Sequence, residues 1–245
     1  MKNMKVSFTP PERQLSPFVA VIWMFESSVG IPSADGRIIV PDGRAKIIVP
    51  YRNSLCAAVN DSLMHANEQQ IFLVGIQSNP VVIGPTATQT STIGIELTPK
   101  GLYHLFHLSM HEIANQMVSF DQLFGSWGAR LQTMLGDAES PQEQIRLLQV
   151  ALTHLLHKND GDYAHLDRTL DMLVQTHGVI RVDELADHIG YTKRYLDRLF
   201  KEHVGVSPKS LASIMRFQRC YQIWMQQTSP TTYWDNVRAY YYDQL

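Results

Sequence analysis

Cysteine and long apolar runs are both scarce in this 245-residue sequence. The two cysteines, Cys56 and Cys220, lie 164 positions apart, which indicates neither a disulfide framework nor a cysteine-based zinc site. The longest unbroken apolar run, residues 18–25, has eight residues, whereas about 20 are needed to cross a bilayer. No apolar stretch of signal-peptide length precedes Pro10 and Pro11. We therefore expect a cytoplasmic protein with no membrane partner.

Motifs that carry catalytic chemistry are also absent. The sequence contains no GxSxG, P-loop or GxGxxG pattern, so neither a serine nucleophile nor a phosphate-binding loop is indicated. We therefore expect no enzymatic activity, no catalytic residues and no cofactor.

One histidine-rich stretch offers a candidate metal site. His107 and His111 have the i, i+4 spacing that lets two imidazoles share a helix face, and His104 and Glu112 lie beside them. Against this, Ser109 is expected to cap a new helix, and no HExxH order is present. The simpler interpretation is histidines on or beside an amphipathic helix. We predict no metal site and keep a histidine metalloenzyme only as a remote alternative.

Length and composition indicate a globular chain. Hydrophobic residues make up 44% and charged residues 18%, a balance that allows sizeable cores and excludes disordered and fibrous classes. A chain of 245 residues fits one large domain or, more naturally, two of ordinary size.

Charge is distributed unevenly along the chain. The formal net charge is −2, but residues 190–220 hold seven basic side chains against two acidic ones, a local charge of +5. Residues 221–245 contribute −1, so residues 1–189 carry −6. A basic patch on an acidic body can mark a phosphate-binding face, although a solvated helix surface has the same composition.

The first hundred residues have the pattern of an antiparallel sheet. Their apolar stretches are short, rich in β-branched residues and bounded by proline and glycine. These stretches cover residues 18–25, 37–40, 45–49, 71–74, 81–83 and 92–97. The Pro41-Asp42-Gly43 sequence predicts a turn, with Asp42 in a turn role and a hairpin joining residues 38–40 to residues 45–49.

Helical periodicity begins near Thr98 and Pro99, which suit an N-cap and a first helical position before residues 100–108. Two further helices are predicted over residues 128–135 and 141–157. The second carries an apolar stripe that either forms a dimer seam or packs within its own domain. A polar break at residues 158–162 places a domain boundary there, giving an N-terminal domain over residues 1–158 and a second domain over residues 163–245.

The basic window has the pattern of a helix-turn-helix motif. After a helix at about residues 163–176, residues 181–190 form a second helix that ends at Gly190, and Thr192 is a good N-cap for residues 193–203. In this last helix Leu196, Leu199 and Phe200 point one way. The charged residues point the other way, as in a recognition helix, although an ordinary amphipathic helix has the same spacing.

These residues resemble the AraC/XylS-type transcription regulators. The resemblance lies in Leu185-Ala186, the run from Thr192 to Lys201, Gly205-Val-Ser-Pro208 and Arg216-Phe-Gln218. It implies that Arg194, Asp197 and Arg198 face the bases, with arginine reading guanine and Asp197 accepting from cytosine or orienting Arg198. The DNA-binding residues expected in this way are Lys193, Arg194, Asp197, Arg198, Lys201, Lys209 and Arg216.

Two other regions bear on the resemblance. Residues 15–18, Trp23, the turn at residues 41–43 and residues 94–99 resemble an uncharacterised domain that precedes this module in one branch of the family, implying a regulatory or dimerisation role. Family members also carry a second helix-turn-helix motif. Residues 232–239 resemble its first helix, but the sequence stops at residue 245, so we expect this second motif to be incomplete.

The sequence therefore predicts an α+β protein with a barrel-like antiparallel β domain, trailing helices and an all-α helix-turn-helix domain. The expected function is sequence-specific transcription regulation, with activation through RNA polymerase implied by the resemblance. Expected partners are double-stranded DNA, a second copy of the chain and a small, mostly uncharged effector, if any. The alternative is a protein-interaction or decoy module that dimerises with other regulators without strong DNA binding of its own.

Overall fold

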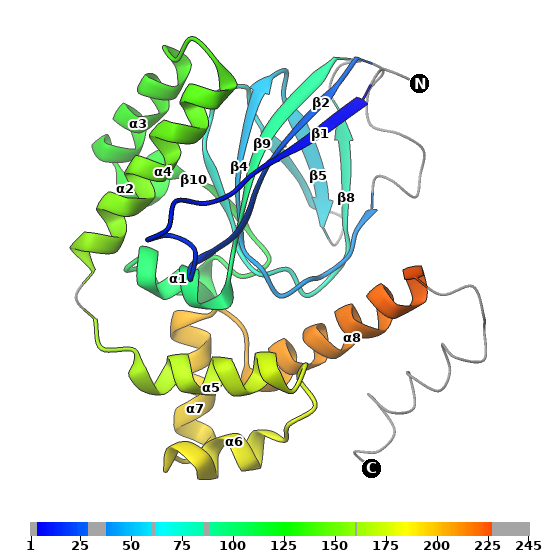
Figure 1. The fold of residues 1–245 in the computed structure, drawn as a ribbon, viewed down its shortest axis with the longest axis vertical. Coiled ribbons are helices and arrows are strands. Elements are labelled where there is room, and N and C mark those ends of the chain that lie inside the picture. The colour runs from blue at the N-terminus through cyan, green and yellow to red at the C-terminus, as the bar shows by residue number, and fades with distance from the viewer. Residues whose placement is uncertain (1–3, 29–37, 60–61, 86–88, 160, 227–245) are drawn as a thin grey trace.

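A computed structural model describes residues 4–28, 38–59, 62–85, 89–159 and 161–226. Its first part contains two antiparallel sheets that face each other, and its second part is helical and lies at one end of the sheets (Figure 1). This confirms the α+β class and the predicted order of a β part followed by helices. Within the described residues, no helix is long and apolar enough to cross a membrane.

The larger sheet has six strands in the order β1-β2-β9-β4-β7-β10. Its strands are β1 (Met4–Thr9), β2 (Val19–Ser27), β4 (Lys46–Arg52), β7 (Phe72–Val74), β9 (Thr90–Leu97) and β10 (Met117–Ser119). Strand β9 lies between β2 and β4, and all but one of its residues are buried. The strand still alternates: Ile93, Ile95 and Leu97 belong to the apolar core, whereas Thr92 and Glu96 lie on its opposite face.

The smaller sheet has four strands in the order β3-β8-β5-β6. Its strands are β3 (Ile38–Ile39), β5 (Leu55–Val59), β6 (Ser62–Ala66) and β8 (Val81–Pro85). The hairpin predicted between residues 38–40 and 45–49 is wrong, because β3 pairs with β8 whereas β4 pairs with β7 and β9. Both edges of β4 are occupied, so no edge remains for β3.

The predicted turn itself is present. Gly43 has a φ of 72°, and an Asp42 carboxylate oxygen accepts a hydrogen bond from the Arg44 backbone N–H at 3.0 Å. A side chain that accepts from the backbone two residues later closes an Asx turn, and glycine adopts positive φ without steric cost. The turn therefore forms a corner between the two sheets.

Five helical segments follow the strands or lie between them. They are α1 (Pro99–Leu105), the 3₁₀ turn η2 (Met110–Glu112), α2 (Phe120–Phe124), α3 (Ser126–Gly136) and α4 (Pro141–Lys158). The Thr98 hydroxyl accepts from the Gly101 N–H at 3.1 Å, which confirms the predicted cap. Helix α1 ends three residues before the predicted residue 108, because Phe106 turns into extended backbone and is buried near Phe120 and Phe124.

The apolar stripe of α4 packs within the chain. Ile145, Leu148 and Leu152 are buried in the same apolar cluster as Leu131 and Leu135 of α3. This outcome favours intramolecular packing over the dimer seam that the sequence left open.

A single apolar core joins the β part to the helices that follow. Its buried side chains come from positions between Leu15 and Ile214, and they form one contiguous cluster. The division into domains at residues 158 and 163 stays a prediction.

Trp23 of β2 lies directly over Gly94 on the neighbouring strand β9. A Cβ atom at residue 94 would lie 2.1 Å from Cζ2 of Trp23. We expect Gly94→Ala to lower the free energy of unfolding by about 1–3 kcal/mol, measured by urea denaturation, because the indole must move. The loss should shrink in a Trp23→Leu background. Equal losses in both backgrounds would show that the indole is not the obstacle.

Candidate nucleic-acid interface

Four helices form the unit that carries the candidate DNA-binding residues. They are α5 (Ala164–Gln175), α6 (Val182–Ile189), α7 (Lys193–His203) and α8 (Pro208–Gln226). The observed bounds of α5, α6 and α7 agree with the predicted bounds within one residue at each end. Their inner faces are buried together, and the buried side chains include Leu170, Leu173, Leu185, Ala186, Leu196, Phe200 and Leu211.

The turn between α6 and α7 has the geometry that its sequence predicts. Gly190 adopts the left-handed conformation with φ 70° and ψ 26°, and the Tyr191 N–H donates to the Ala186 carbonyl at 3.1 Å. This pattern ends a helix by satisfying its last carbonyls. The Thr192 hydroxyl then accepts from the Tyr195 N–H at 3.2 Å and starts α7. The turn is therefore closed by its own hydrogen bonds.

Burial of one face of α7 decides which side chains point to solvent. Leu196 and Phe200 are fully buried, so the opposite face is turned outward. Lys193, Arg194, Arg198 and Lys201 are exposed on α7, and Asp197 is half-buried. The five predicted α7 residues therefore share one outward-facing surface.

The charged groups of this surface are partly paired. Lys193 Nζ lies 2.5 Å from a carboxylate oxygen of Asp183, and this pairing lowers the pKa of Asp183. Lys201 Nζ lies 2.8 Å from Asp197 at i, i+4 spacing. Exposed pairs of this kind contribute little stability and exchange readily for other partners, including phosphate.

The two arginines are free of ion pairs among the described residues. The Arg198 guanidinium lies over the Tyr195 ring, 5.4 Å from its centroid, in a cation–π arrangement. The Arg194 side chain makes no hydrogen bond or ion pair within the part of the chain that the structure describes. A guanidinium with unused donors can bind two acceptors at once, as on the major-groove edge of guanine.

The last two predicted residues differ from each other. Lys209 is exposed at the start of α8. Arg216 is half-buried and donates to the Gly178 carbonyl and to the Ser213 hydroxyl. Arg216 therefore ties α8 to the loop after α5, and its contact with a phosphate stays a prediction. The predicted second helix-turn-helix motif, residues 232–245, lies outside the described residues.

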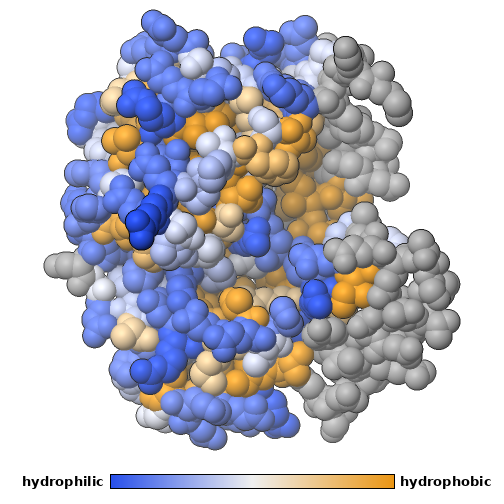
Figure 2. Space-filling view, in the orientation of Figure 1, coloured by the Kyte–Doolittle hydropathy of each residue, from blue (hydrophilic) through white to orange (hydrophobic). Residues whose placement is uncertain are grey.

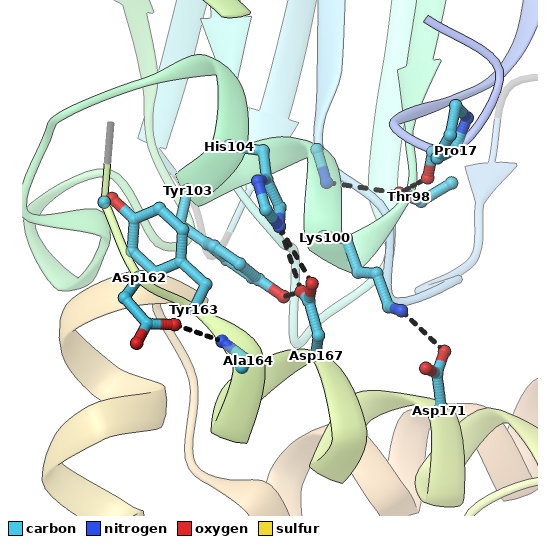
Figure 3. A network of polar contacts seen from close by, with 12 residues as sticks. Pro17, Thr98, Lys100, Tyr103, His104, Asp162, Tyr163, Ala164, Asp167 and Asp171 are labelled. Atoms are coloured by element: carbon cyan, nitrogen blue, oxygen red, sulfur yellow. Dashed lines mark hydrogen bonds and ion pairs between the residues drawn. The ribbon is translucent and has the colours of Figure 1, made fainter. Parts of the chain in front are cut away.

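The helical unit is docked on the β part through a polar network that sequence reasoning missed (Figure 3). Asp167 of α5 accepts a hydrogen bond from the Tyr103 hydroxyl and lies 3.0 Å from Nε2 of His104. Lys100 Nζ lies 2.7 Å from Asp171. The Asn159 side chain donates to the His104 carbonyl at 3.0 Å. No local pattern reveals these contacts, because each joins residues more than 50 positions apart.

This network also accounts for part of the histidine-rich stretch. His104 faces Asp167, and His111 Nδ1 lies 3.0 Å from the Ser109 hydroxyl, which itself donates to Glu202 of α7. No group of three or more histidine, cysteine or acidic side chains gathers at metal-binding distance in the described part of the chain.

Comparisons with known proteins give the following matches. Residues 7–119 match a family model described as a domain of unknown function, DUF6597. None of the curated proteins matches the sequence. Among solved structures, the chain is similar to ToxT from Vibrio cholerae strain SCE256 with an unsaturated fatty acid bound, at 9% identity and a TM-score of 0.44, covering 98% of this chain and 92% of ToxT.

Two other solved structures are similar to parts or most of the chain. The AraC-like transcriptional activator CuxR matches at 12% identity and a TM-score of 0.34, covering 90% of this chain and 86% of CuxR. The cupin domain of Schizosaccharomyces pombe Cnp3 matches at 12% identity and a TM-score of 0.31, covering 40% of this chain and 66% of that domain. The solved structures similar to this chain thus include both AraC-like regulators and cupin domains.

The docking network yields a prediction about pH. Burial, and then the hydrogen bond to Asp167, raise the pKa of Tyr103 far above its usual value. Tyr103→Phe should lower the free energy of unfolding by about 1.5–3 kcal/mol at pH 8, the usual range for a hydrogen bond to a charged group.

The sign of the pH dependence follows from the raised pKa. The folded state keeps the Tyr103 proton, whereas the unfolded chain releases it above about pH 10. The tyrosine's contribution is therefore complete below pH 10 and declines as the pH rises further. Urea unfolding of the wild type and Tyr103→Phe at pH 8 and pH 11 should show a smaller difference at pH 11. A constant difference would contradict the buried, protonated phenol.

Proposed function

We propose that this protein is a sequence-specific, DNA-binding transcription regulator with no enzymatic activity. The observation that carries the proposal is the closed turn between α6 and α7, which leaves the outer face of α7 exposed with four cations on it. A helix presented in this way enters the major groove, where its first turns meet base edges and its flanking lysines meet phosphates.

In this proposal the two arginines carry the base recognition. Arg194 and Arg198 lie one helical turn apart, so both can face the groove at neighbouring base pairs. Asp197 either accepts from cytosine or orients Arg198, and in the unbound protein it pairs with Lys201. Lys193, Lys201 and Lys209 bind phosphates, and Arg216 is a weaker candidate because its guanidinium already bonds within the helical unit.

The β part has the regulatory role in this proposal. It encloses a cavity for a small-molecule effector, described below, and it holds the helical unit through the Tyr103 network. The resemblance to AraC/XylS-type regulators further suggests a homodimer and a contact with RNA polymerase on the DNA.

The experiment that tests DNA reading is selection of a preferred duplex from random sequences, followed by binding measurements. Arg194→Ala and Arg198→Ala should each weaken binding to that duplex by about 1–3 kcal/mol and relax the preference at one base pair. Lys201→Ala should weaken binding to all duplexes alike and reduce the slope of log affinity against log salt by about 1.

Arg146→Ala is the matched control, because Arg146 is an exposed arginine on α4, outside the helical unit. It should leave both affinity and preference unchanged. An unchanged sequence preference for both Arg194→Ala and Arg198→Ala would show that α7 does not read the bases.

A further inference from the structure

A cavity of about 720 Å³ lies between the two sheets. The apolar side chains that face it come from both, and they include Trp23, Phe25, Ile48, Met64, Ile83 and Met117. Figure 2 shows apolar surface gathered in a recess on the β-sheet side of the molecule. The volume lies in the range of pockets that hold small organic molecules, which are mostly apolar with a few polar groups.

Two polar atoms in the wall have no partner within the described part of the chain, Thr92 Oγ1 and Gln77 Oε1. Thr92 of β9 is only 2% exposed, lines the cavity, and its hydroxyl makes no hydrogen bond within the described part of the chain. A buried hydroxyl without a partner costs free energy, and a ligand group that bonds to it recovers that cost. The cavity therefore favours a ligand with a hydroxyl group of its own at the β9 wall.

The charged residues of the wall neutralise one another. Arg44 Nη1 lies 2.8 Å from Glu96, and Lys46 Nζ lies 2.5 Å from Asp42. All four residues line the cavity, so it offers no unpaired charge to an ionic ligand. A carboxylate would have to break one of these pairs or be buried unpaired, and either event is costly.

The same wall is in contact with α8. Pro41 and Asp42 line the cavity, and the Pro41 carbonyl accepts a hydrogen bond from the Gln218 side chain at 2.7 Å. Gly43 in the same turn is buried, and a Cβ atom there would lie 3.2 Å from Leu211 of α8. A displacement of this turn would therefore change its contacts with α8, the helix that packs behind α7.

We infer that the cavity binds an uncharged, largely apolar molecule that carries a hydroxyl group, and that the turn at residues 41–44 transmits its binding to α8. The ligand class follows from Thr92, Gln77 and the paired charges, independently of any DNA binding. The consequence for DNA affinity rests on the proposed function, because it needs α7 to be the DNA-reading helix.

The test is isothermal titration calorimetry on the full chain. Decan-1-ol and menthol serve as probes, with decanoate as the charged counterpart of decan-1-ol. At least one alcohol should bind with a Kd at least about tenfold lower than that of decanoate at pH 8.

Two variants test the mechanism. Thr92→Val keeps the shape of the side chain but removes the hydroxyl, and it should weaken alcohol binding about threefold to tenfold. Binding of the alcohol should also change amide hydrogen exchange in residues 211–218. That change should be lost in Gln218→Ala and kept in Gln222→Ala, an exposed glutamine one turn further along α8.

The outcomes separate the claims. Failure of both alcohols to bind, or equally tight binding of decanoate, would overturn the ligand class. Binding of an alcohol with unchanged exchange in α8 would overturn transmission through the turn. Binding together with the exchange change, in a chain that binds no DNA, would support this inference while the proposed function fails.

Discussion

Burial of Leu196 and Phe200 is the interaction on which the surface proposed for DNA binding depends. Both side chains are removed from solvent in a core that also includes residues of α5, α6 and α8. Burying a side chain of this size contributes about 1.5–3 kcal/mol, more than an exposed ion pair on the opposite face of the helix. The apolar face therefore determines the orientation of α7, and the charged residues occupy the remaining face.

The β part adds a second constraint, because it holds the helical unit in one orientation. Tyr103 and Lys100 of α1 contact α5, Ser109 contacts α7, and the turn at residues 41–44 contacts α8. None of these contacts involves a basic residue of α7. The four cations of α7 are exposed while the helical unit is docked on the β part.

Local patterns were sufficient to predict helices α3 to α7 and the caps at Thr98, Gly190 and Thr192, because each depends on residues within one or two turns. They missed the short helix α2. They were not sufficient for strand pairing. The turn at residues 41–43 was predicted correctly, but the hairpin was not, since the partners of β4 lie 20–50 residues away and fill both its edges. The pairing of Arg44 with Glu96 and the contacts of Asp167 escaped prediction for the same reason, because their partners are more than 50 residues away. The outward placement of the α7 cations did follow from the sequence, because helical periodicity alone separates them from Leu196 and Phe200.

The most direct test of the central claim is photocrosslinking from the outer face of α7. p-Benzoylphenylalanine at position 194 should crosslink to a base within the preferred duplex, at protein concentrations above the Kd of the variant. The same group at position 139, on the exposed loop before α4, should give no crosslink. A variant that binds the duplex but crosslinks only from position 139, or from neither position, would contradict the assignment of α7 to the major groove.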